Sequence, residues 1–177
     1  GAVKQFAYDN LIGGKTYGSS EILALNDHQF LVLERDGKGL GDGSAAKIKQ
    51  IWAIDLTGAA DVSNLSGEAA LVAKAPTKKL FLDLKAALNS FGIADTMIPS
   101  KLEGMAFGLD IFENGELFHT LYVANDNDFD VLDPLNTNQF FVFKFSDRDL
   151  LNLGLDAFQQ QSIPEPGSLV MLLGGLG

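Results

Sequence analysis

Cysteine is absent from this chain of 177 residues, and histidine and tryptophan are nearly absent. The lack of cysteine excludes thiol catalysis, zinc–thiolate sites and disulfide bonds, although it does not fix the cellular compartment. The two histidines are His28, in a polar turn, and His119, in an apolar stretch. We expect His28 to be exposed, and a lone histidine in a strand, such as His119, usually has a structural role.

Positive charge is also scarce, because 13 Lys and Arg residues face 23 Asp and Glu residues and leave a net charge of −10. Binding to nucleic acid relies on clustered Lys and Arg, so this balance argues against a nucleic-acid partner. The excess of carboxylates suits an extracellular or periplasmic protein that binds divalent cations. Hydrophobic residues make up 46% of the chain, which is enough for the packed core of one ordinary domain.

Motifs for nucleophilic and nucleotide chemistry are lacking as well. No Gly-x-Ser-x-Gly sequence occurs, and Ser19, Ser20 and Ser100 lack a nearby histidine partner, so a serine hydrolase is not supported. The glycines of residues 10–19 are not followed by the lysine and Ser/Thr of a phosphate-binding loop. The glycine-rich loop 36–44 suits either a flexible connection or backbone carbonyls that wrap a cation.

Short apolar strands, by contrast, are present in two similar groups. In each group a glutamate opens the first strand, and the second strand ends in an acidic corner. Repetition of several strands per unit is typical of stacked blades. The predicted fold is therefore mainly β, a partial propeller of β-propeller-like blades with one inserted short helix. The expected strands are 20–25, 29–35, 47–56 and 69–74 in the first group, and 103–108, 116–124 and 140–145 in the second.

The spacing between the two groups varies slightly, as loops of different length require. It is 82 positions from Glu21 to Glu103, 91 from Asp36 to Asn127, and 89 from Ile51 to Phe140.

Local signals predict the remaining elements. Leucines at helical spacing predict a helix over residues 79–91, with Gly92 as its stop. Asn114-Gly115 is a strong signal for a tight turn between two strands. Residues 147–153 suit one or two helical turns.

The acidic corners are candidate cation sites. Asn125-Asp126-Asn127-Asp128 directly follows the apolar run Leu121 to Ala124. Ca²⁺ takes six to eight oxygen ligands in loose geometry, which side chains at strand ends can supply. Asn and Asp also dominate ordinary turns, because they bond their own backbone. Both interpretations apply to this segment.

The C-terminal segment differs in composition from the rest. A polar linker leads to Pro164-Glu165-Pro166, which stands ahead of an apolar run from Leu169 to Leu176. That run is too short to cross a bilayer, which takes about 20 apolar residues. The segment resembles the PEP-CTERM sorting signal of Gram-negative bacteria, in which an exosortase processes Pro-Glu-Pro followed by a hydrophobic helix and a basic cluster. The basic cluster is absent here, so either the sequence is cut short or the signal is defective.

The body of the chain, from about residue 19 to 155, resembles the phytase-like family described as having esterase-like activity of phytase. The resemblance implies a β-propeller-like fold in a secreted protein that hydrolyses phosphate or other esters. It covers only the later part of such a domain, so we expect upstream blades to be missing. The matching segments are Ser20–Leu25, Leu31–Asp36, Lys78–Leu84, Leu102–Phe107 and Val123–Phe129.

The resemblance also implies a shared site near the channel between blades. Metal ligands would be Glu34, Asp36, Asn125, Asp126 and Asp128, with Ca²⁺ as the implied cofactor. The implied catalytic residues are Glu21, Arg35 and Glu103. In this scheme a metal-bound water attacks the ester, and the Arg35 guanidinium holds a phosphate or carboxylate oxygen. Alternatively, Arg35 pairs with Glu21 or Glu103 to fix the blades, and the corners bind Ca²⁺ only for rigidity.

These observations predict two domains, residues 1–158 for the phytase-like part and 159–177 for the linker and sorting segment. The expected function is a Ca²⁺-dependent hydrolase of small phosphate esters, located outside the cell or in the envelope of a Gram-negative bacterium. Exosortase is the expected partner of the C-terminal signal, and only that segment would meet the membrane. The alternative is a non-catalytic propeller that binds partners or has a structural role at the cell surface.

Overall fold

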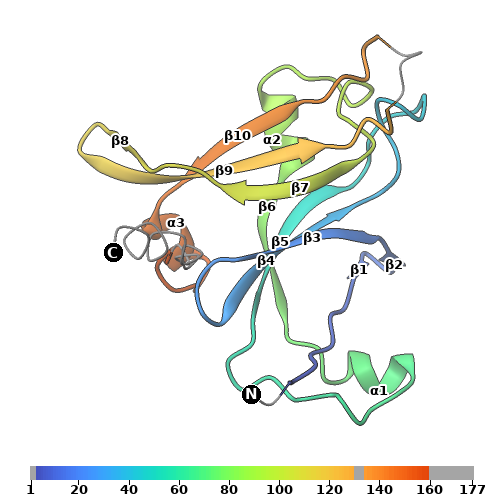
Figure 1. The fold of residues 1–177 in the computed structure, drawn as a ribbon, viewed down its shortest axis with the longest axis vertical. Coiled ribbons are helices and arrows are strands. Elements are labelled where there is room, and N and C mark those ends of the chain that lie inside the picture. The colour runs from blue at the N-terminus through green and yellow to red at the C-terminus, as the bar shows by residue number, and fades with distance from the viewer. Residues whose placement is uncertain (1–2, 130–133, 160–177) are drawn as a thin grey trace, which may run out of the picture.

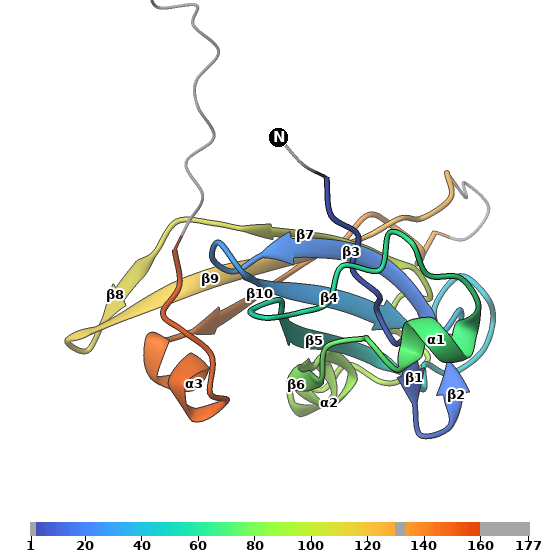
Figure 2. The same cartoon turned by 90° about the horizontal axis from the view of Figure 1, so that it is seen from below.

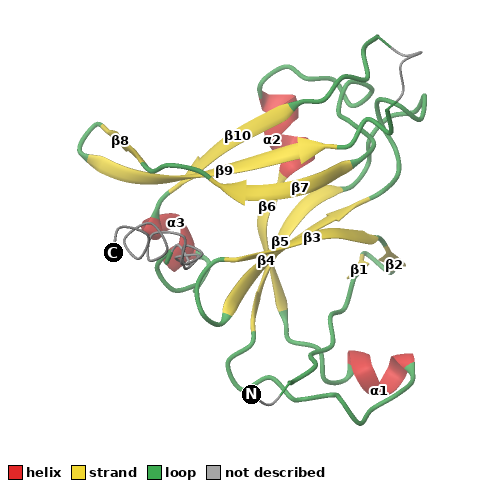
Figure 3. Ribbon diagram, in the orientation of Figure 1, coloured by secondary structure: helices red, strands yellow, loops and turns green. Residues whose placement is uncertain are grey.

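The computed structural model describes residues 3–129 and 134–159, and it is mainly β (Figures 1 and 3). Three antiparallel sheets account for the strands of this part of the chain. The smallest is a hairpin of β1 (Leu11–Ile12) and β2 (Lys15–Thr16), which lies in a segment expected to be a loop. We call the other two the first and the second sheet.

The first sheet has four strands in the order β3-β4-β5-β6, and it confirms the predicted hairpin and the strand that follows it. Leu31, Leu33 and Ile51 are completely buried on one face, because alternate residues of a strand point to the same side. Its strands are β3 (Gly18–Ala24), β4 (Gln29–Arg35), β5 (Lys49–Asp55) and β6 (Lys78–Asp83).

The fourth strand does not lie where the sequence predicted it. Residues 69–74 fall mostly in helix α1 (Glu68–Val72), and the predicted helix 79–91 begins instead with β6. Pairing with β5 decides the strand, since the backbone groups of β6 bond to that neighbour. Asp83 then caps helix α2 (Leu84–Ser90) by accepting a hydrogen bond from the Ala86 N–H.

The second sheet has the order β10-β9-β7, with β8 paired to β9. Asn114 and Gly115 both have positive φ and form the predicted tight turn. The turn joins β9 to the short β8 rather than directly to β7. The capped helix α3 (Asp147–Asn152) follows β10, as the sequence predicted. The strands are β7 (Leu102–Phe107), β8 (Ile111–Glu113), β9 (Glu116–Asn125) and β10 (Phe140–Phe145).

The two sheets are structural repeats of one another. A β-bulge interrupts the first strand of each, at Ser20 in β3 and at Glu103 in β7. Matching the bulges makes Glu103 equivalent to Ser20, one position earlier than the predicted match with Glu21. The remaining strands keep the predicted spacings, because Leu33 then corresponds to Ala124.

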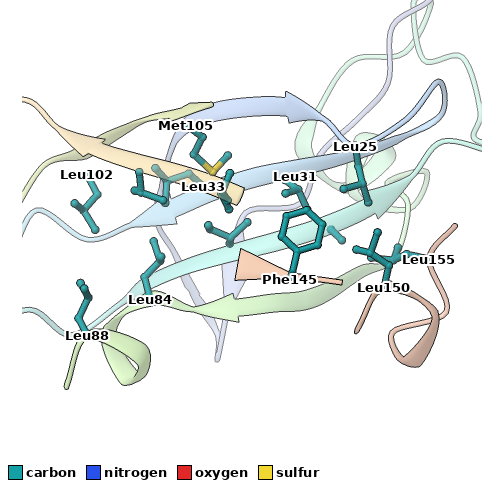
Figure 4. Packing of buried hydrophobic residues seen from close by; sticks show 14 of the residues in the cluster. Leu25, Leu31, Leu33, Leu84, Leu88, Leu102, Met105, Phe145, Leu150 and Leu155 are labelled. Carbon is teal, nitrogen blue, oxygen red and sulfur yellow. The ribbon is translucent and has the colours of Figure 1, made fainter. Parts of the chain in front are cut away.

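The core lies between the two sheets and is closed at its ends by α2 and α3 (Figure 4). Leu33 of the first sheet and Met105 of the second belong to this single cluster, together with Leu84 and Leu150 of the helices. Figure 2 shows the three helices along one side of the strands.

A closed propeller is not seen in the described residues, so that part of the fold prediction stays a prediction. The outer face of the second sheet exposes Tyr122, Phe140 and Val142. By the repeat these positions correspond to the face of the first sheet that packs against the second. Within the described residues, no further sheet covers that face of the stack.

Candidate functional site

Charged side chains gather where strands of the two sheets end. β4 ends at Arg35, β5 begins at Lys49, and β7 begins just after Lys101. These cations and their carboxylate partners form three ion pairs that we call the strand-end cluster: Arg35–Glu103, Asp36–Lys49 and Lys101–Asp128.

The pair of Arg35 and Glu103 joins the two sheets. The Arg35 Nη2 donates to the Glu103 carboxylate, which the bulge of β7 turns toward it. Arg35 is 17% exposed and Glu103 is 34% exposed, so the pair is partly shielded from solvent. The Arg35 Nε is buried and has no hydrogen-bond partner among the described residues. This buried donor is therefore unsatisfied within the described part of the chain.

Lys49 is fully buried and holds the loop after β4 against the start of β7. Its Nζ lies 2.9 Å from the Asp36 carboxylate and 2.8 Å from each of two carbonyl oxygens, those of Asp36 and Ser100. Burial lowers the pKa of Lys49, and the Asp36 carboxylate opposes that shift. The second Asp36 oxygen accepts the N–H groups of Lys47 and Ile48. Asp36 thus has no free ligand position.

The corner after β9 is built as a turn. Asp126 accepts the N–H of Asp128 at 2.8 Å, and its own N–H donates to the Lys101 carbonyl. Asp128 has a φ of 54°, in the left-handed region that Asp tolerates. Its carboxylate raises the pKa of the half-buried Lys101, whose Nζ lies 2.5 Å away. The turn interpretation of this segment therefore accounts for its geometry.

Glu34 lies apart from the strand-end cluster, because successive residues of β4 point to opposite faces. Its carboxylate is completely buried and bonds the Lys78 Nζ at 2.6 Å and the Tyr8 hydroxyl. Burial, followed by the hydrogen bond to Glu34, raises the pKa of Tyr8. The Glu34 Oε2 has no partner among the described residues.

The two remaining predicted residues are engaged with the backbone. Glu21 accepts the N–H of the adjacent Ile22. The Asn125 side chain accepts from the Gln139 N–H and donates to the Thr137 carbonyl. The structure thus brings together Arg35, Asp36, Glu103, Asp126 and Asp128 of the predicted site, and it engages Glu34, Glu21 and Asn125 elsewhere.

The residues present do not fit a closed calcium site. In residues 3–129 and 134–159 no group of three or more histidine, aspartate and glutamate side chains is placed to hold a metal ion. Glu34, Asp36, Glu103 and Asp128 each face a cation instead. We therefore assign no chemical step to a metal, and calcium binding stays a prediction.

The sequence interpretation missed the cations that organise these contacts, namely Lys49, Lys78 and Lys101. One signal could have found the first of them. Lys49 stands two positions before Ile51 and four before Ala53, so period-two alternation places it on the buried face of β5. A lysine at such a position needs acidic or carbonyl partners.

Both histidines bridge carboxylates rather than standing alone. His28 contacts Asp27 and Asp156, and the buried His119 contacts Asp110 at 2.9 Å and Asp147 at 3.3 Å. These contacts support the structural role expected of His119.

The predicted sorting residues Pro164, Glu165 and Pro166 lie outside the described residues. Within the described part of the chain, no helix has the length and apolar character needed to cross a membrane.

Comparison with known proteins places the chain in a family. Residues 1–129 match the phytase-like family whose description is "Esterase-like activity of phytase". No curated protein and no solved structure matches the chain. The family match covers well over half of the 177 residues and includes both sheets up to the corner after β9. The chain therefore belongs to the phytase-like family.

Proposed function

We propose that this protein is an ester hydrolase whose substrates are small phosphate esters, and that the strand-end cluster binds the phosphate. The observation that supports this proposal is the Arg35 guanidinium, which is 17% exposed beside its pair with Glu103 and whose Nε has no partner among the described residues. A guanidinium with a spare donor suits a planar or tetrahedral oxyanion. Lys101, half-buried and close enough to Glu103 for their charges to interact, adds a second cation that pairs with Asp128.

The chemistry needs one base and one anion-binding group. Arg35 would hold the non-bridging phosphate oxygens and offset charge that develops on them. Glu103, the more exposed member of the pair, would take a proton from the attacking water. Water oxygen then bonds to phosphorus, the ester oxygen leaves, and the leaving alcohol gains a proton from solvent.

A non-catalytic binding or structural protein is the second candidate. The observation that favours it is that every ion pair in the strand-end cluster also ties neighbouring strand ends together. In this case Arg35 and Glu103 would only fix the two sheets.

Hydrolysis of p-nitrophenyl phosphate, p-nitrophenyl acetate and phytate by the full chain separates the two candidates. We expect phosphate-ester turnover that Glu103→Gln lowers by about 100-fold, the usual size of a lost general base. Lys144→Gln is the matched control, because Lys144 and Glu113 form an exposed pair away from the strand-end cluster. Absence of turnover with and without Ca²⁺ would favour the binding protein.

We also propose that the protein is exported and that exosortase processes its C-terminal segment in a Gram-negative envelope. The support is the Pro164-Glu165-Pro166 sequence ahead of the apolar run. Fractionation of an exosortase-containing host tests this. Replacing Pro164 and Pro166 by alanine should move the protein between fractions, and an unchanged distribution would contradict the proposal.

A further inference from the structure

The second sheet lacks a strand that the first sheet has. In the first sheet β6 pairs with the outer edge of β5, whereas β10, the equivalent of β5, has no strand on its outer edge within the described residues. Figure 1 shows β10 at the rim of its sheet. An unpaired edge presents a row of free N–H and C=O groups, which are a template for another strand.

The backbone register identifies those free groups. Asn125 donates its N–H to the Gln139 carbonyl, so residues of β10 that alternate with Gln139 bond to β9. The intervening residues Phe140, Val142 and Lys144 therefore turn their N–H and C=O groups toward the open edge. No proline or buried charge on β10 blocks this edge.

A cavity of about 760 Å³ runs along the same edge. Four consecutive residues of β10, from Val142 to Phe145, line it. Consecutive residues point to opposite faces, so residues of both faces of β10 border the cavity. Thr120 and Leu121 of β9 and Ile111 of β8 also line the cavity. The rest of the lining comes from Phe81 and Leu82 of β6, the exposed Phe91, and residues in and next to α3. This cavity is the edge groove.

The walls of the edge groove decide what it accommodates. Residues of β6, of β10 and in and next to α3 line the same cavity. Four positions at about 3.3 Å each make it roughly 13 Å long. The lining is mainly aromatic and aliphatic, and an extended apolar peptide fits such a surface.

At one end of the edge groove β10 carries a positive charge where the equivalent strand of the first sheet, β5, carries a negative one. By the repeat, Lys144 corresponds to Asp55 of β5. β6 brings Lys78 and Lys79 to the end of β5 that carries Asp55. A strand that enters the edge groove in the same orientation would meet Lys144, so it should begin with acidic residues.

From these observations we propose that the edge groove binds an extended, apolar, acid-led peptide segment of another protein, antiparallel to β10. The peptide completes a fourth strand of the second sheet. Its backbone bonds to Phe140, Val142 and Lys144, and alternate side chains enter the apolar groove. This interaction is independent of the strand-end cluster and of hydrolysis.

The test uses two labelled peptides and the full chain, with fluorescence anisotropy as the readout. One peptide has the β6 sequence Lys78–Asp83, and the other has the same sequence with K78E and K79E. We expect the acid-led peptide to bind roughly fivefold more tightly, the size of one favourable surface charge contact. In Lys144→Glu protein the order should reverse. Glu113→Gln, which frees Lys144 from its partner, should strengthen the acid-led complex.

An acid-led peptide that is N-methylated at alternate residues is the control for backbone pairing, and it should lose binding. The proposal is overturned if neither peptide binds, if Lys144→Glu leaves the preference unchanged, or if N-methylation has no effect. Self-association of the chain that Val142→Lys abolishes would also overturn it, since the occupant would then be a second copy.

Discussion

Arg35, at the end of β4, donates to the carboxylate of Glu103, at the bulge of β7. This contact joins the second strand of the first sheet to the first strand of the second sheet. The two residues are 68 positions apart in the sequence. The contact depends on the bulge, because regular pairing of β7 with β9 would place Glu103 opposite a residue of β9 instead of beside Arg35. The pair is thus both an inter-sheet tie and the centre of the proposed phosphate site.

A double-mutant cycle on Arg35→Ala and Glu103→Ala measures the strength of the tie. We expect a coupling free energy of about 1 kcal/mol, because the pair is only partly shielded and solvent screening reduces its contribution. Urea unfolding gives the four free energies. The same cycle on Lys144 and Glu113, an exposed pair, should yield a smaller value. Equal coupling in both cycles would show that the contact does not hold the sheets together.

Gly39→Ala should destabilise the junction between the sheets strongly. Gly39 has a φ of 129°, and an added Cβ would stand 2.2 Å from the Ile98 carbonyl oxygen. We expect a loss of about 3 kcal/mol or more, because both the backbone conformation and the contact are unfavourable.

Gly43→Ala is the matched control for that variant. Gly43 also has positive φ, at 73°, but an added Cβ meets nothing within 4 Å. Its cost should be about 1 kcal/mol, that of the left-handed conformation alone. Thermal unfolding of both variants tests the comparison, and similar losses would refute the importance of the contact with Ile98.

Tyr8→Phe should change the alkaline stability of the protein. The folded state raises the pKa of Tyr8, through burial and the bond to Glu34. The unfolded chain therefore loses this proton near pH 10 while the folded chain keeps it, and the stabilisation is lost as the pH rises above that value.

Removal of the hydroxyl should cost about 2 kcal/mol at neutral pH, the value of a hydrogen bond to a charged group. The variant should also lose less stability than wild type above pH 10. Tyr17→Phe is the control, because the Tyr17 hydroxyl bonds no carboxylate within residues 3–129 and 134–159. Parallel pH profiles for Tyr8→Phe and wild type would count against the buried contact.

His28→Gln should flatten the pH dependence of stability on the alkaline side of pH 6.5. Hydrogen bonding to Asp27 raises the pKa of His28, with Asp156 as a further contributor. The stabilisation is therefore complete below pH 6.5 and disappears as the pH rises through the raised pKa. The melting temperature of wild type should fall over that range, and that of His28→Gln should fall less. A proton NMR titration of His28 that gives an ordinary pKa would contradict this.

Calcium titration of Glu103→Ala and Asp126→Ala tests the metal prediction in the complete chain. The sequence predicts that both variants bind Ca²⁺ more weakly than wild type. The ion pair of Glu103 with Arg35 and the turn contact of Asp126 predict unchanged binding instead. Glu116→Ala, at the distant start of β9, is the control. Unchanged isothermal titration curves for both strand-end variants would contradict the prediction that Ca²⁺ binds at the strand ends.

Alternating apolar residues and turn signals predicted most of the strands correctly. Phe140 to Phe145 is a strand as expected, and Asn114-Gly115 forms the expected turn. The error at residues 69–91 has a clear cause. Leu80, Leu84 and Leu88 have helical spacing, yet Leu80 belongs to β6 and the other two to α2, because β5 supplies a pairing partner that periodicity does not reveal.

The site was predictable only in part. Arg35 and Glu103 were named as a possible pair, and the structure forms it. The partners Lys49 and Lys78 were not found, because they come from strands 13 and 44 positions away from the acids they contact. Pairing over such distances depends on sheet order, which local patterns do not encode.

The last described residues are fixed to both sheets. Phe158 packs against His119 and Phe107 with ring centroids 4.5 Å apart, and Gln159 donates its N–H to the Leu25 carbonyl. A load applied to the chain beyond residue 159 would therefore reach the β3–β4 hairpin and the second sheet at the same time. Because both sheets share such a load, tension at this end of the chain would not pull a single strand away from its neighbours.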